Sequence, residues 1–235
     1  MSATGDSLAH ARFLGNGIRG VTGVCITTVA STHTLSRASV SEGSCIKLMQ
    51  DFVGTSLEAI VQTPSLGRDK ETVLSTCCRT FNRNLFLDYW LPPKGHYPTF
   101  PQGRRALDNI LNWREGDNPE DLGDSTLQYI RNFRSLASGR AFFITYERDI
   151  GLAPAAVRAG DIIVVLLGVD SVMTFRNVGN GLFKVVGEAY LDGFTTGEIV
   201  LGKFKDDWVR MSRFDEETKA YWQAYFNIRT RMILR

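Results

Sequence analysis

The spacing of apolar residues changes once along the chain, near Gly139. Before this residue, apolar positions mostly recur every three or four residues, as they do on one face of an amphipathic helix. After it, they alternate or run together, which is typical of strands. The pattern predicts an α+β fold with four parts: a strand and polar loop at 1–40, a helical portion at 41–139, a small antiparallel β-barrel at 140–201, and a C-terminal helix at 202–235.

Within the helical portion, four stretches keep one apolar face: 46–60, 73–81, 107–113 and 127–137. Ser44 is expected to cap the first helix and Asp124 the last, because both side chains can accept a hydrogen bond from a free backbone N–H. Gly139 is expected to end the last helix in a left-handed conformation. An irregular loop is expected at residues 92–101, which hold four prolines, and an acidic loop at residues 116–123.

Five stretches read as strands: 18–30, 141–146, 161–168, 172–178 and 182–191. Glycine-containing turns at residues 159–161 and 179–181 separate the later ones. Short strands joined by such turns are typical of a small barrel, to which the early strand would return. Alternation places Phe175, Phe183 and Val185 in the barrel core. The polar residues 31–43 are expected to form a surface loop.

The last residues are predicted to be helical. Ser212 and Asp215 stand at the spacing of a capping box, and Phe214, Tyr221, Trp222 and Tyr225 follow at helical spacing. We expect this aromatic stripe to dock on its own chain. The alternative is that Tyr221, Trp222 and Tyr225 dock on a partner protein.

Composition limits the classes of function. The chain has 27 basic and 25 acidic residues, a net charge of +2, so it lacks the field of a dedicated nucleic-acid binder. Its longest apolar run, Ile162–Leu167, is too short to span a membrane. Four cysteines without C-x-x-C spacing favour a reducing, cytoplasmic location.

Motifs of catalytic and cofactor sites are incomplete. Gly15–Gly20 matches a dinucleotide fingerprint, but a strand pattern follows it where a helix is needed. Gly197–Lys203 resembles a P-loop, but Phe204 replaces the required hydroxyl. His10, His33 and His96 have no metal-ligand partner at ligand spacing. We therefore expect no cofactor, no metal and no enzymatic activity; an enzyme whose cysteine, histidine and carboxylate meet on folding stays an alternative.

One strand face carries a candidate binding site. Alternation along residues 182–191 places Lys184, Glu188 and Tyr190 together, and the preceding strand adds Arg176. We expect this face to be a polar seam in which Glu188 pairs with Lys184 or Arg176. The alternatives are plain solvent surface and a ligand site, in which case the barrel would bind a small ligand or nucleic acid.

Over residues 142–198 the chain resembles the C-terminal region of fungal heterokaryon incompatibility (HET-domain) proteins. The resemblance rests on five segments in the family's order: Phe142–Thr145, Gly151–Pro154, Gly160–Asp161 through Val169, Val186–Tyr190 with Gly193, and Gly197–Glu198. Ala153 and Thr196 depart from the family pattern. A weaker likeness extends upstream, at Ile18–Val21 and Glu71–Asp88.

The resemblance implies a regulatory or scaffold module of self/non-self recognition that acts through a protein partner. The family's signalling domain opens with a Tyr–Ser–Tyr–x–Trp–Gly type strand. The one Tyr–Trp pair here, Tyr89–Trp90, precedes Leu91 in an unrelated context. We therefore expect the chain to be the follow-on region without that signalling domain, and no catalytic residue of the family maps onto it. The partner and the oligomeric state are left open.

Overall fold

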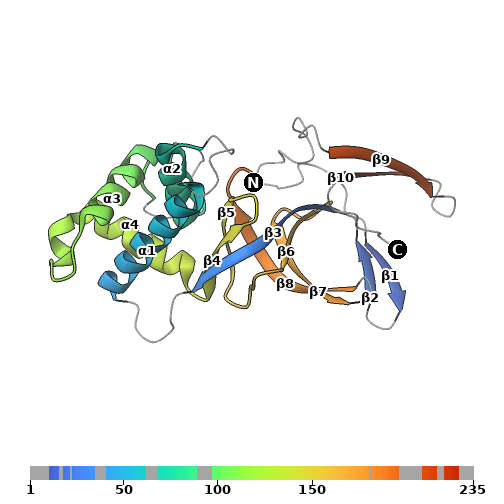
Figure 1. Ribbon diagram of the computed structural model, residues 1–235, viewed down its shortest axis with the longest axis horizontal. Helices are drawn as coiled ribbons and strands as arrows, with labels where there is room; N and C mark the ends of the chain where they lie inside the picture. Colours follow the sequence, from blue (N-terminus) through green and yellow to red (C-terminus); the bar gives the residue numbers. More distant parts are fainter. Residues whose placement is uncertain are drawn as a thin grey trace. The chain divides into compact units, whose positions relative to one another are not determined.

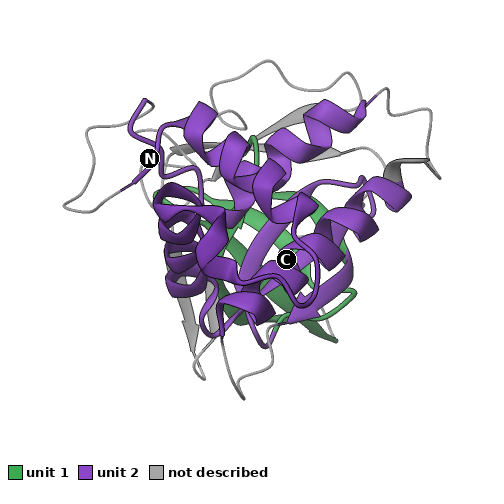
Figure 2. Cartoon of the chain, turned by 90° about the vertical axis from the view of Figure 1, so that its left-hand side faces the viewer, with its two compact units in different colours: residues 1–29, 157–235 green, residues 30–156 purple. Residues whose placement is uncertain are grey.

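The computed structural model describes residues 11–15, 18–21, 23–34, 41–61, 68–88, 97–179, 182–195, 208–215 and 220–227. The chain forms two compact units, coloured separately in Figure 2. Unit 1 comprises residues 1–29 and 157–235, and unit 2 comprises residues 30–156.

The helices in the described ranges, labelled in Figure 1, belong to unit 2. They are α1 (Glu42–Val61), α2 (Lys70–Phe81), α3 (Phe100–Asn112), a short 3-10 helix η2 (Pro119–Leu122) and α4 (Asp124–Ala137). The four predicted helices are therefore confirmed, although η2 interrupts the loop expected at residues 116–123. Gly139 follows α4 with a φ of 69°, the left-handed stop that the sequence predicts.

The helix starts differ from the predicted caps. Helix α1 begins at Glu42, and it is the Ser41 hydroxyl that accepts a hydrogen bond from the Ser44 backbone, so Ser44 is not the N-cap. Asp124 is the first residue of α4 rather than its cap. In the same way, Pro101 lies in the first turn of α3, where no intrahelical N–H bond is lost, and not in an irregular loop.

Aromatic side chains fill the core of unit 2. The Phe142 ring lies 5.0 Å from that of Phe52, 5.3 Å from Phe81 and 5.6 Å from Phe133. All four rings are buried, and those of Phe133 and Phe142 are stacked with an interplanar angle of 2°. Phe142 belongs to β4 (Arg140–Thr145), so this aromatic cluster packs the helices of unit 2 against a strand of the same unit.

Six strands close a barrel in the order β3-β4-β5-β8-β7-β6. They are β3 (Gly23–Thr34), β4 (Arg140–Thr145), β5 (Ile150–Pro154), β6 (Ile162–Leu166), β7 (Val172–Gly179) and β8 (Leu182–Leu191). The pairs with a described register are antiparallel. Strand β3 pairs with β6, which confirms that the early strand returns to the barrel.

Two strands outside the C-terminal segment, β5 and β1 (Ala11–Gly15), were not predicted. Strand β5 contains Gly151 and Pro154, which are poor strand formers, yet four of its five residues are buried. Strand β1 pairs with β2 (Ile18–Val21). The Asn16–Gly17 dipeptide between them is a common hairpin signal, which the sequence interpretation treated only as a flexible entry.

The predicted C-terminal helix is wrong. The structure has two antiparallel strands there, β9 (Trp208–Asp215) and β10 (Ala220–Asn227). The expected capping box, Ser212 to Asp215, is part of β9. Tryptophan, tyrosine and phenylalanine favour strands, and this preference outweighs the helical spacing of the rings. The polar loop expected at residues 31–43 is also shorter, because Ser31–Thr34 extend β3. Residues 35–40 of that loop lie outside the described ranges.

The barrel strands of unit 1 are apolar on both faces. One face carries Ile163, Val165 and Val172, which are fully buried. The other carries a cluster of Val164, Leu166 and Phe175, with Phe183 packed against it. Phe175 and Phe183 therefore belong to a core as predicted, but Val185 is 54% exposed and does not.

Of the helices in the described ranges, none has the length and hydropathy required to cross a bilayer.

Candidate functional site

Asp161 of unit 1 is a buried charged residue with several hydrogen bonds. It follows Gly160, whose φ of 87° makes the tight turn before β6, and its side chain is 2% exposed. Arg176 of β7 donates from Nε to Oδ1 and from Nη2 to Oδ2, both at 2.8 Å. These hydrogen bonds raise the pKa of Arg176, so the guanidinium stays charged throughout the physiological range.

The same residue also hydrogen-bonds to the middle of β3. The Asp161 carbonyl accepts a hydrogen bond of 2.8 Å from the Val29 backbone, and Gly160 donates one of 2.9 Å to the Val29 carbonyl. The Asp161 carboxylate also accepts from the Arg158 backbone at 2.8 Å. The Gly160–Asp161 pair therefore joins β3, β6 and β7, a structural role that the sequence interpretation did not assign to it.

The four predicted binding residues do not share one face. Phe175 lies opposite Val185 but Thr174 lies opposite Gly187, so β8 contains an extra residue, Val186. This β-bulge reverses the alternation along β8.

Two separate pairs result from the bulge. Arg176 lies directly opposite Lys184 on one face of the sheet. Glu188 lies opposite Met173, three positions from Arg176, and therefore faces the other side together with Tyr190. The register thus places Glu188 on the other side of the sheet from Arg176, which binds the Asp161 carboxylate, and from Lys184, which is exposed. The pairing expected of Glu188 stays a prediction. A binding role for any of the four residues stays a prediction.

Tyr190 is buried and has a structural contact. Its hydroxyl donates a hydrogen bond of 2.9 Å to Oδ1 of Asp192, in the turn that follows β8. The proposed docking residues of the tail lie in β10, where Tyr221 is opposite Phe214, Trp222 opposite Arg213 and Tyr225 opposite Arg210. Docking through them stays untested.

The cysteines of unit 2 are buried. Cys45, Cys77 and Cys78 form no disulfide bond. Burial raises the pKa of Cys45 and of Cys78 to about 11, so both are neutral near pH 7. His33 packs edge-on against Phe52, with ring centroids 5.4 Å apart.

The enzyme alternative also depends on metal ligands and on the three histidines. No group of three or more histidine, cysteine, aspartate or glutamate residues there is arranged to hold a metal ion. His10 and His96, two of the three histidines on which that alternative depends, lie outside the described ranges.

A polar hollow lies at the end of α3 in unit 2. Its volume is about 360 Å³, and its walls include Asn109, Asn112 and Trp113 from the end of α3, and Asp117, Asn118 and Asp121 from the acidic loop. The sequence interpretation treated the acidic loop as solvated surface and overlooked the hollow. The signal that could have found it is the concentration of amide side chains around one tryptophan at residues 109–118.

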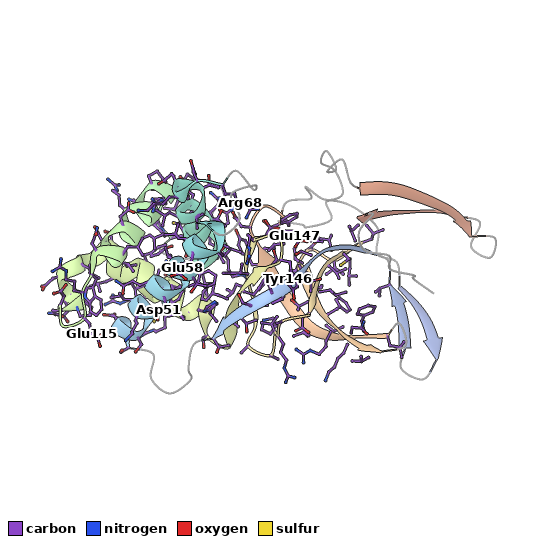
Figure 3. All side chains as sticks on the ribbon, in the orientation of Figure 1. Asp51, Glu58, Arg68, Glu115, Tyr146 and Glu147 are labelled. Carbon is purple, nitrogen blue, oxygen red and sulfur yellow. The ribbon has the colours of Figure 1, made fainter. Side chains whose placement is uncertain are left out.

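A tight turn joins β4 and β5 in the same unit. Arg68 donates to the Arg148 carbonyl at 2.7 Å and to the Asp149 carboxylate, which fixes this turn. Figure 3 labels Arg68 together with Tyr146 and Glu147 of the turn, and Glu115 lies at the far end of the helices from them. The hollow and the turn are therefore separate features of unit 2.

Comparison with protein families gives one match. Residues 119–210 match the family model of the Het-6 beta-barrel domain. The matched segment runs from η2 through α4 and β4–β8 into β9, and it does not include β3. No curated protein and no solved structure matches the chain.

Proposed function

We propose that this chain is a regulatory or scaffold module of fungal heterokaryon incompatibility, because residues 119–210 match the Het-6 beta-barrel domain, a domain of fungal heterokaryon incompatibility proteins. It acts by binding a protein partner and not by catalysis. The observation that carries the proposal is the family match over a segment that contains five of the barrel strands.

The arrangement of polar groups supports a module without catalysis. The Asp161 carboxylate and the Arg176 guanidinium bind each other, and the Gly160–Asp161 backbone binds Val29, so these groups serve to join strands. The buried thiols of Cys45 and Cys78 are neutral. A cytoplasmic location accords with these reduced cysteines, and the net charge of +2 gives little attraction for nucleic acid.

The β7–β8 hairpin is the surface that we assign to the partner. Val178 and Leu182 are exposed at the end of this hairpin, while Val185, also exposed, lies on the opposite side of β8 from Leu182. Exposed aliphatic side chains close together are typical of protein interaction surfaces. Lys184 is exposed on the Leu182 side of β8, so we expect a partner surface that is apolar and carries carboxylates.

The test uses the tagged full-length chain in fungal cells undergoing heterokaryon formation. Proteins bound to the chain are cross-linked to it in the cells and recovered through the tag. We expect Leu182→Glu to abolish both the recovery of the partner and the effect of the chain on incompatibility. The matched control is Leu87→Glu in unit 2, because Leu87 and Leu182 are each 42% exposed. The control should retain both properties, and thermal melts should show both variants folded.

Either of two results would reject the proposal. If Leu182→Glu and Leu87→Glu both behave like the unmodified chain, the hairpin is not the docking surface. If deleting the entire chain leaves incompatibility unchanged, the chain has no role in this recognition system.

A further inference from the structure

The hollow at the end of α3 is held in a fixed shape. Gln50 of α1 donates from Nε2 to the carbonyl oxygens of Ile110 and Trp113, both at 2.8 Å. Asn109 donates to the Thr126 hydroxyl of α4 at 3.1 Å. These contacts fix the end of α3 against two neighbouring helices, so the wall of the hollow is preformed. Its volume of about 360 Å³ lies within the roughly 300–1,000 Å³ of small-molecule sites.

Trp113 contributes an apolar surface to this wall. Its Nε1 is buried, with no hydrogen-bond partner in the described part of the chain, although the residue as a whole is partly exposed. The exposed part of the indole is therefore carbon. An indole surface of this kind packs against the C–H groups of a ligand.

The polar walls offer more acceptors than donors. Asp117 uses one carboxylate oxygen to accept from the Arg114 backbone at 2.9 Å, which leaves its other oxygen for a ligand. Asn118 uses its side-chain oxygen to accept from the Glu120 backbone, which leaves its NH₂. Asp121 and Asn112 are exposed and line the same hollow. A ligand that suits these groups must donate several hydrogen bonds and also accept some.

The charge of the walls excludes one class of ligand. Asp117 and Asp121 are the charged residues among those that line the hollow, so its walls are negative and repel phosphates and carboxylates. Hydroxyl groups both donate and accept, whereas a guanidinium only donates and would not engage the NH₂ groups of Asn112 and Asn118. The combination therefore favours a neutral ligand with several hydroxyl groups and an apolar C–H face.

We propose that this hollow binds a neutral saccharide unit, with Trp113 against its C–H face and Asn112, Asp117, Asn118 and Asp121 bound to its hydroxyl groups. Such a site is new to this chain and does not depend on the proposed barrel function, because the hollow belongs to the helices and the acidic loop of unit 2.

The experiment is an NMR titration of the isotope-labelled full-length chain with three neutral probes: methyl α-glucoside, methyl α-mannoside and N-acetylglucosamine. At least one probe should saturably shift the Trp113 indole signal and the Asn112 and Asn118 side-chain amides, with a Kd in the millimolar range. Trp113→Ala should weaken binding about tenfold by removing the packing surface. Asn112→Ala, at an exposed helix end where folding is not at risk, should also weaken it.

The charge control compares two carboxylates that are six residues apart. Asp121→Asn should weaken binding several-fold, whereas Glu115→Gln should not change it. Glu115 directly precedes the acidic loop but does not line the hollow, and its carboxylate lies 3.8 Å from the Lys47 ammonium. Figure 3 labels Glu115 at the outer end of the helices.

A salt series and a cationic probe decide between ligand classes. Binding of a neutral saccharide should be unchanged between low and high salt, since no charge pair is formed. The proposal is overturned if agmatine binds more tightly than every glycoside and weakens as salt rises, because the hollow would then be a cation site. It is equally overturned if none of the glycosides shifts the Trp113 signal, or if the lining variants bind as well as Glu115→Gln.

Discussion

The Asp161 carboxylate receives two hydrogen bonds from the Arg176 guanidinium and one from the backbone of residue 158. A carboxylate that is 2% exposed depends on such donors, because burial without them would be costly. The family resemblance draws attention to Gly160–Asp161, and the structure supplies the reason for this pair of residue types. The glycine permits the turn, and the aspartate joins three strands.

A first prediction concerns this ion pair. Asp161→Asn should lower the free energy of unfolding, because the amide cannot balance the guanidinium of Arg176. Arg176→Gln should also destabilise the chain. The double variant should lose less stability than the sum of the single losses, since the two side chains interact directly. Urea unfolding of all four proteins measures this, and strict additivity would show that the pair contributes no coupling.

A second prediction concerns His33. Burial lowers the pKa of its imidazole below the ordinary value of 6.5, and the charge of Asp51 opposes part of this shift. The unfolded chain therefore takes up the proton at a higher pH than the folded chain. The stability contributed by neutral His33 should fall as pH drops below 6.5 and should stop falling once the pH is below the pKa of the folded state.

His33→Gln isolates this contribution from other titrating groups. Chemical unfolding between pH 7.5 and 5 should show a smaller loss of stability in the variant than in the unmodified chain. An equal loss in both proteins would mean that His33 does not titrate differently in the folded and unfolded states.

At the scale of single elements, two helical glycines provide a matched pair. A Cβ placed on Gly103 of α3 would lie 2.7 Å from Cε1 of Phe86 and 3.3 Å from Sγ of Cys78, whereas one on Gly54 of α1 would meet no atom within 4 Å. Alanine is the better helix former at a free position. We expect Gly54→Ala to stabilise the chain by about 0.5–1 kcal/mol, and Gly103→Ala to destabilise it by about 1–3 kcal/mol through overpacking. Thermal melts give both signs, and stabilisation by Gly103→Ala would contradict the packing of α3.

The bulge in β8 supports a fourth prediction. Phe175 is buried within its cluster, while its neighbour across the sheet, Val185, is 54% exposed. Phe175→Ala should cost about 3–5 kcal/mol. Val185→Ala should stay within about 0.5 kcal/mol of the unmodified chain. Equal losses in denaturant unfolding would indicate that Val185 is part of the core after all.

At the scale of the whole molecule, the barrel is assembled from distant parts of the sequence. Strand β3 lies about a hundred residues before β4, and it closes the barrel between β4 and β6. The match to the Het-6 beta-barrel domain begins at residue 119 and so omits this strand. Without β3, the backbone groups of β4 and β6 that it pairs would be left open.

A fifth prediction follows for fragments of the chain. A fragment of residues 119–210 should be aggregated or incompletely folded, whereas residues 11–210 should give a cooperative melt. Adding a peptide of residues 18–34 to the short fragment should partly restore folding, because the peptide can occupy the vacant strand position. Hydrogen exchange of the β4 and β6 amides reports the outcome. A cooperative melt of the short fragment alone would show that β3 is dispensable.

The sequence by itself determined the elements whose local signals agree with their environment. The four helices have amphipathic patterns, which predicted their existence, although the capping box of Thr99 and Gln102 that begins α3 was not recognised. The strands of the β portion have continuous apolar runs between glycine turns, and the likeness to heterokaryon incompatibility proteins followed from motifs in these same strands. In each case a residue's own neighbours along the chain set its conformation, so the pattern could be read without knowing the fold.

Tertiary structure decided what depends on distant contacts. Strand β5 is buried despite Gly151 and Pro154, because its environment outweighs weak strand propensity. The bulge at Val186 depends on how β8 pairs with β7, and it alone separates Glu188 from Arg176 and Lys184. The hollow beside Trp113 and the pairing of Asp161 with Arg176 arise from residues that are remote in sequence or fixed by remote contacts. Alternation along a single strand cannot report an extra residue, because register belongs to the pair of strands and not to either strand alone.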